Sequence, residues 1–69
     1  MKYAIVIETA GDNFSAYVPD LPGCVATGTS ESEVELAIKD AISIHLKGLR
    51  EDGLPCPLPT SRVEYVDTL

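Results

Sequence analysis

The feature that most constrains the fold is a single helical segment, which the sequence delimits at both ends between residues 30 and 53. Ser30 and Glu33 form an S-x-x-E capping box, in which the serine side chain accepts a hydrogen bond from a helix amide. Gly53 predicts the C-terminal stop, because glycine readily adopts the left-handed conformation that often ends helices. A chain of 69 residues then has room for this helix and a few short strands, in one domain spanning residues 1–69.

An apolar stripe runs along the predicted helix at 3.6 residues per turn. It comprises Val34, Ile38, Ala41, His45 and Leu49. His45 is the only histidine, and its functional interpretation would be a catalytic base or a pH switch. The sequence places no serine, cysteine or carboxylate to form a dyad with it. We therefore expect a partly buried, hydrogen-bonded structural histidine on the inner face of the helix.

Four strands are predicted around this helix. Lys2–Glu8 is apolar on both faces, as in a central strand, and Phe14–Val18 alternates after a turn at Gly11-Asp12-Asn13, which predicts a hairpin. Cys24–Thr29 and Arg62–Asp67 supply the third and last strands. The expected fold is α+β in the order β-β-β-α-β, with a four-stranded mixed sheet and one helix on one face. The last strand should lie beside the first, because a helical crossover normally joins parallel strands.

Prolines punctuate the chain twice. The run Pro19-Asp20-Leu21-Pro22-Gly23 ends the second strand, and its last two residues suit the centre of a type II turn. Asp20 is expected to bind backbone amides within this turn, with contact to a partner protein as the alternative. The run Leu54-Pro55-Cys56-Pro57-Leu58-Pro59 cannot be helical and predicts an extended connector back to the sheet.

A single helix covers one face of the sheet and leaves the other face without a layer. That face is expected to expose one set among Tyr3, Ile5, Ile7, Tyr17, Val25 and Val63 or their neighbours. An uncovered apolar sheet face calls for a partner. A domain of this size also buries only about 60% of its unfolded surface. We therefore expect a homo-oligomer, either a dimer or a tetramer.

The charge balance bears on the class of partner. The net charge is −6 with only five lysines and arginines, which argues against direct binding of DNA or RNA. A basic protein partner is favoured, although acidic residues also simply keep proteins soluble. The candidate contacts are Glu8, Asp12, Asp20 and Glu64, in or beside the predicted strands and turns. No signal peptide or membrane-length apolar run is present, so a cytoplasmic location is expected.

Enzymatic chemistry is weakly represented. Glu8 and Asp67 end the first and last predicted strands and could approach each other, as carboxylates do in metal-dependent nucleases. The chain has no phosphate-binding loop and no paired-cysteine zinc spacing. Cys24 and Cys56 are expected to be small buried apolar residues. We expect no catalytic residues, no metal and no cofactor, with a vestigial nuclease as the alternative.

Three stretches together resemble the HicB-like antitoxin family. Phe14–Cys24, with the sequence FSAYVPDLPGC, resembles the signature of the family. Gly28–Glu33 resembles its helix start, and Arg50–Pro55 with Pro57 and Pro59 resembles its helix end. The resemblance implies a partial ribonuclease H-like fold without nuclease activity. It also implies binding to a HicA-type toxin, a small basic RNA-cleaving protein whose catalytic histidine the antitoxin covers.

The chain departs from the family pattern after its last predicted strand. Full antitoxins of this family carry a C-terminal helix-turn-helix or ribbon-helix-helix segment that binds operator DNA. The sequence ends at Leu69 without such a segment, so DNA binding and repression are not expected of it. Stand-alone members of this kind leave a second possibility open, an orphan domain that associates with itself and has no toxin.

Overall fold

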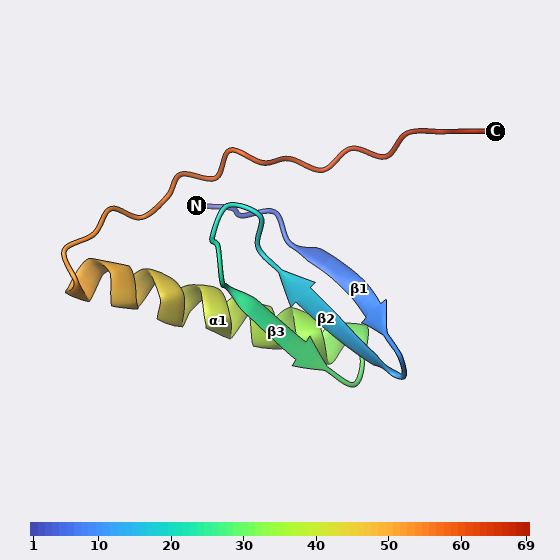
Figure 1. The fold of residues 1–69 in the computed structure, drawn as a ribbon, viewed down its shortest axis with the longest axis horizontal. Helices are drawn as coiled ribbons and strands as arrows, with labels where there is room; N and C mark the ends of the chain where they lie inside the picture. The colour runs from blue at the N-terminus through green and yellow to red at the C-terminus, as the bar shows by residue number, and fades with distance from the viewer.

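The computed structural model describes all residues, Met1–Leu69, as a three-stranded sheet, one helix and an extended C-terminal segment (Figure 1). The strands β1 (Val6–Ala10), β2 (Asn13–Tyr17) and β3 (Val25–Gly28) are antiparallel in the order β1-β2-β3. The helix α1 (Glu31–Glu51) packs on one face of the sheet, mainly over β3 and β2. The α+β class is therefore confirmed. No helix of this chain has both the length and the apolarity of a membrane span.

Two glycines allow the turns that join the strands. Ala10 pairs with Asn13, so Gly11 and Asp12 form a two-residue hairpin loop, and Gly11 has a φ of 64°. Glycine at the first central position is the requirement of a type II′ turn. The second turn closes with a 3.0 Å bond from the Cys24 amide to the Leu21 carbonyl, and Gly23 there has a φ of 83°. A positive φ at this third position is what a type II turn requires.

Side chains and glycine satisfy the ends of α1. The Ser30 hydroxyl accepts from the Glu33 amide at 3.1 Å. The Glu33 carboxylate reaches back to the Thr29 hydroxyl and amide, at 2.8 and 3.2 Å, one residue earlier than a capping box requires. These two bonds lower the pKa of Glu33, the hydroxyl bond most. At the other end Gly53, with a φ of 71°, closes a Schellman motif in which the Leu54 amide donates to the Leu49 carbonyl.

The core lies between α1 and the inner face of the sheet. Its buried side chains are Ala16, Val18, Leu21, Cys24, Val34 and Ile38. Gly28 is buried where β3 meets the helix start, and a Cβ there would lie 2.7 Å from the Val34 amide nitrogen. Only glycine lets the two backbones approach this closely. The half-buried apolar residues of the helix that pack against this core are Ala41, Ile42 and Leu46, and no residue of 54–69 is among the core side chains or the apolar residues packed on them.

The predicted fourth strand is absent from the sheet, which is three-stranded and antiparallel instead of four-stranded and mixed. Arg62–Asp67 is extended and each of its residues is exposed, and no backbone–backbone hydrogen bond involves a residue after Leu54. The β-branched and aromatic residues of this stretch favour an extended backbone, but a strand also needs a neighbour. We call residues 54–69 the C-terminal segment; Figure 1 shows it running free of the sheet.

Candidate protein-binding surface

The face of the sheet opposite α1 carries one apolar and one polar row of side chains. Val6, Tyr17 and Val25 are cross-strand neighbours in one row, and Glu8, Ser15 and Thr27 form the next row along the strands. Because side chains alternate along a strand, both rows point away from the helix that the intervening residues contact. Tyr17 is 41% exposed and Val25 is 65% exposed. We call this surface the open sheet face.

The sequence predicted an uncovered face but left open which residues it carries. The structure places Tyr3, Ile5 and Ile7 against the core instead. Tyr17 and Val25 belong to the open sheet face, and Val63 lies in the C-terminal segment, away from the sheet. One residue of register decides such assignments, because a shift by one moves every side chain of a strand to the other face.

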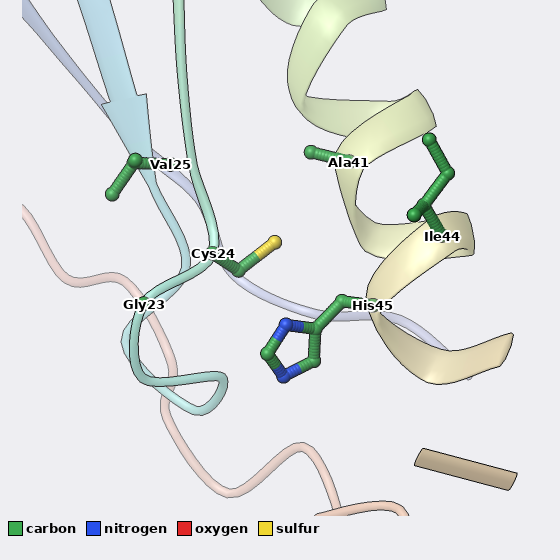
Figure 2. Close-up of a pocket in the computed structure, with 6 residues that line it drawn as sticks. All are labelled: Gly23, Cys24, Val25, Ala41, Ile44 and His45. Carbon is green, nitrogen blue, oxygen red and sulfur yellow. The ribbon is translucent and has the colours of Figure 1, made fainter. Parts of the chain in front are cut away.

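A shallow groove of about 260 Å³ separates the start of β3 from α1 (Figure 2). Its lining consists of Gly23, Cys24, Val25, Ala41, Ile44 and His45. Burial raises the pKa of the Cys24 thiol, which keeps it protonated and unreactive. Ile44 is 72% exposed on the rim of the groove. It is not part of the predicted apolar stripe, so the sequence analysis did not identify it as a surface residue of interest. The groove is open and mostly apolar, so it suits contact with a protein surface more than enclosure of a small ligand.

His45 lies on the wall of this groove, half-buried, with its ring turned toward the loop at Gly23 and Cys24 (Figure 2). The predicted partial burial is therefore confirmed. The predicted hydrogen bond is not, because no side-chain or backbone partner lies within bonding distance of its ring. An open groove lets water solvate the ring nitrogens, so burial at this position does not demand a protein partner.

The four acidic candidates lie apart from one another. Glu8 is on the open sheet face, and Asp12 is at the tip of the β1–β2 hairpin. Glu64 is in the C-terminal segment, where it forms a 2.6 Å ion pair with Arg62. No hydrogen bond or ion pair joins any two of the four. They spread negative charge over the surface and do not form a single site.

Asp20 holds the C-terminal segment to the rest of the molecule. Its carboxylate accepts bonds from the amide and hydroxyl of Ser61, at 2.9 and 2.8 Å, and from those of Thr60, at 3.1 and 3.0 Å. The bonds from Ser61 contribute most to holding the pKa of Asp20 below its ordinary value. Asp20 thus binds amides forty residues away and not those of its own turn, which corrects the local role expected from the sequence. We call this contact the clasp.

The partners of Asp20 escaped the sequence analysis. Thr60 and Ser61 follow the proline run, and each offers an amide and a hydroxyl donor. Two such residues in succession can bind one carboxylate, and this is the sequence signal that could have indicated the contact. Tyr3 adds a second tether, because its hydroxyl donates to the Pro57 carbonyl. Cys56, half-buried where a buried residue was expected, adds a third, because its thiol donates to the Leu46 carbonyl at 3.9 Å. The start of the C-terminal segment is therefore fixed at three points, while the residues after Ser61 are not.

The approach of Glu8 and Asp67 that the nuclease alternative required does not occur through neighbouring strands, because Asp67 lies in the unpaired segment. No group of three or more histidine, cysteine, aspartate or glutamate side chains converges on a position that could hold a metal ion. The geometry on which the nuclease alternative depended is thus missing from this chain.

Comparisons with known proteins agree on one family. The family model described as the HicB-like antitoxin of bacterial toxin–antitoxin systems matches residues 3–68. A protein of Haemophilus phage HP1, described as a 14.9 kDa protein of the rep–hol intergenic region, is 39% identical over 67 residues. That match covers 97% of this chain but 50% of the phage protein, so the chain spans about half the length of this relative.

Two further comparisons give the same result. A UPF0150 protein of Helicobacter pylori is 43% identical over 49 residues, covering 71% of this chain and 68% of the relative. Among solved structures, a chain of the HicA3 and HicB3 toxin–antitoxin complex is similar with a TM-score of 0.75 and 28% identity, covering 87% of this chain and 70% of the other. A family match over nearly every residue and a fold shared with a chain of such a complex lead to one conclusion: this chain belongs to the HicB-like antitoxin family.

Proposed function

We propose that this chain neutralises a HicA-type toxin by binding over the active site of the toxin, with no chemistry of its own. The family match over residues 3–68 carries the proposal, and the likeness to a chain of the HicA3 and HicB3 complex supports it. A net charge of −6 complements a basic partner. The chain would act by bound contact alone, so that the toxin is inactive while this chain covers its catalytic surface.

The open sheet face is the surface that we propose for this contact. The row Val6, Tyr17 and Val25 offers adjacent apolar side chains, and Glu8 places a carboxylate beside them. A partly exposed tyrosine among apolar neighbours is the kind of anchor found at the centre of protein interfaces. Asp12 and Glu64 would act as outlying charges that steer the toxin in. Asp20 would add only its charge, because the clasp already occupies both of its oxygens.

The proposal also covers the type of fold and the binding of nucleic acid. We propose that the three strands and the helix are the partial ribonuclease H-like core, and that the chain does not itself bind DNA or RNA. Five basic residues supply too few phosphate contacts for such binding. An orphan domain that associates with itself remains the second candidate function, favoured by the unpaired C-terminal segment.

The proposal is tested with the purified chain and a purified HicA-type toxin. RNA cleavage by the toxin should stop at equimolar chain. Tyr17→Glu places a charge at the centre of the open sheet face and should weaken inhibition at least about tenfold. Leu36→Glu is the matched control, because Leu36 is 68% exposed on the outer side of α1 and away from that face. Equal inhibition by both variants would contradict the assignment of the surface, and no inhibition by the unaltered chain would contradict the function.

A second measurement separates steering charge from contact. Between about 50 and about 500 mM salt, association of the chain with the toxin should slow, because screening shortens the reach of surface charge. Glu8→Gln with Asp12→Asn should flatten this dependence, whereas His45→Gln should leave it unchanged. Salt-independent association would contradict the steering role of these charges, and loss of binding only in the histidine variant would assign the contact to the groove of Figure 2 instead.

A further inference from the structure

The outer edge of β3 presents backbone groups that no other strand of the chain uses. The Val18 amide donates to the Cys24 carbonyl at 3.2 Å, which makes these two residues a bonded pair at the end of the β2–β3 ladder. Bonded and non-bonded pairs alternate along an antiparallel ladder, so the amides and carbonyls of Val25 and Thr27 point away from β2. No backbone–backbone bond outside the ladder involves either residue. These groups therefore line the edge without partners in the chain.

The β3 edge also lacks the features with which proteins usually protect exposed strands. β3 has the sequence VATG, with no charged residue, no proline and no bulge in its register with β2. Val25 and Thr27 are both exposed. The strand at the other edge, β1, carries the charged Glu8 and is not a strand over which α1 mainly packs. Of the two edges, β3 is the one better suited to accept a further strand.

The groove of Figure 2 lies beside the start of this edge. Cys24 and Val25 line it on the strand side, and Ala41, Ile44 and His45 line it on the helix side. Side chains of a strand added to β3 would point alternately to the open sheet face and to the side of α1. Those on the side of α1 would meet the groove, where Ile44 is 72% exposed. A free edge with a pocket for alternate side chains is the arrangement that recognises extended peptides.

We propose that an extended segment of the HicA-type toxin adds to the sheet beside β3 and places an apolar side chain in the groove. This inference rests on the proposed function and specifies how the toxin contact continues beyond the open sheet face. Val25 belongs both to the apolar row of that face and to the groove, so the two surfaces are continuous. A toxin seated on the open sheet face therefore reaches the β3 edge within the same contact.

The rows of the open sheet face indicate the pattern of the added segment. Its side chain beside Val25 continues the apolar row and should be apolar, whereas its side chain beside Thr27 continues the polar row. The net charge of −6 favours a basic residue at the polar position. The C-terminal segment of this chain does not fill the edge, because the clasp holds its base and Figure 1 shows it clear of β3.

Binding of a purified HicA-type toxin to variants of the full chain tests the backbone contact. Thr27→Pro removes an outward donor but no bond to β2, so the affinity should fall at least about tenfold while the circular dichroism is unchanged. Thr27→Val keeps the amide and should bind as the unaltered chain does. Thr9→Pro is the matched control: Ala10 and Asn13 close the hairpin as a bonded pair, which turns the Thr9 amide to the opposite edge of the sheet.

A groove variant tests the side-chain contact without altering a strand. Ile44→Glu places a charge where an apolar side chain would pack and should also lower the affinity at least about tenfold. Leu36→Glu adds the same charge on the outer side of α1 and should not. Either glutamate adds to the attraction of a basic toxin, so a loss confined to Ile44→Glu identifies contact in the groove.

Amide hydrogen exchange identifies the edge that pairs. On adding the toxin, the amides of Val25 and Thr27 should gain protection, and those of Ile7 and Thr9 on the β1 edge should not. Toxin binding without this protection would overturn strand addition and leave the proposed function intact, whereas no binding by the unaltered chain would remove both. Protection at Ile7 and Thr9 instead would overturn the choice of edge. Protection of Val25 and Thr27 at high concentration without toxin would make a second copy the occupant and would likewise overturn the proposal.

Discussion

Residues 1–53 and the C-terminal segment differ in how their backbone amides and carbonyls form hydrogen bonds. In the first part, strand ladders, two glycine turns and two capped helix ends pair much of the backbone, and all six buried side chains of the core lie there. In the second part, prolines remove donors from the connector, and the amides of Thr60 and Ser61 donate to the Asp20 carboxylate instead of to another strand. The comparison shows that an extended backbone becomes a strand only when the fold supplies a neighbour.

The largest effect should come from the core of the first part. Ile38→Ala creates a cavity at a residue that is 1% exposed and should cost about 2–5 kcal/mol. The whole stability expected for 69 residues is about 3–10 kcal/mol, so this variant should be close to unfolded. Ile44→Ala is the matched control, because Ile44 is 72% exposed on the same helix. Urea unfolding followed by circular dichroism compares the two; similar midpoints would mean that α1 packs by another face.

The contact between β3 and the helix start should be next in size. Gly28→Ala places a methyl group 2.7 Å from the Val34 amide and should cost about 1–3 kcal/mol through forced separation of the two backbones. Gly48→Ala has free space around the new methyl group and should instead stabilise the helix by about 0.5–1 kcal/mol. Opposite signs in one urea series are the expected outcome. A tolerated alanine at position 28 would show that strand and helix lie further apart.

The helix cap should have a smaller effect. Ser30→Ala removes the acceptor of the Glu33 amide and should lower the free energy of unfolding by about 1 kcal/mol. Ser43→Ala, on the exposed side of the same helix, should change it by less than about 0.5 kcal/mol and in the stabilising direction. Equal denaturation midpoints for the two variants would indicate that the helix begins elsewhere.

The clasp should affect the second part only. Hydrogen bonds from Ser61 and Thr60 lower the pKa of Asp20 below 3.8, so the contribution of the clasp is complete above that pH. It is lost as the pH falls through the lowered folded-state pKa. In a titration by NMR at low concentration, the Thr60 and Ser61 amide shifts should move together below that pH. Asp20→Asn should produce similar shifts at neutral pH, with the urea unfolding midpoint of residues 1–53 unchanged.

Asp12→Asn provides the control for this titration, since Asp12 lies in the hairpin turn and accepts no hydrogen bond. If the Ser61 amide signal stayed fixed down to full protonation of Asp20, the clasp would not exist in solution. If residues 1–53 unfolded together with the clasp, the two parts of the molecule would be a single cooperative unit.

Capping and turn residues predicted the local structure of residues 1–53 well. A serine three residues before a glutamate predicted the start of α1, and Gly53 predicted its end, within two residues of Glu31–Glu51. The Pro22-Gly23 pair predicted a turn that the Cys24 amide closes onto the Leu21 carbonyl. Each of these depends on interactions between residues close in sequence, so the residues themselves carry the information.

Long-range features of the candidate surface were less predictable. The open face carries Val6, Tyr17 and Val25, while Ile5 and Ile7, their neighbours along the chain or across the sheet, turn inward. Both sets are apolar, so composition alone did not distinguish them. Asp20 was assigned to its own turn because the bonds from Thr60 and Ser61 cross forty residues, a pairing for which the sequence offers no spacing rule.

The sequence by itself determined the helix, the two glycine turns, the hairpin and the acidic charge, because propensity, capping and net charge are properties of residues and their near neighbours. Only the tertiary structure decided which face of the sheet stays open, that Gly28 must lie against the helix start, and that Arg62–Asp67 has no strand beside it. Those outcomes depend on where distant backbones meet. The extended form of residues 62–67 follows from their side chains, whereas pairing requires an edge within reach.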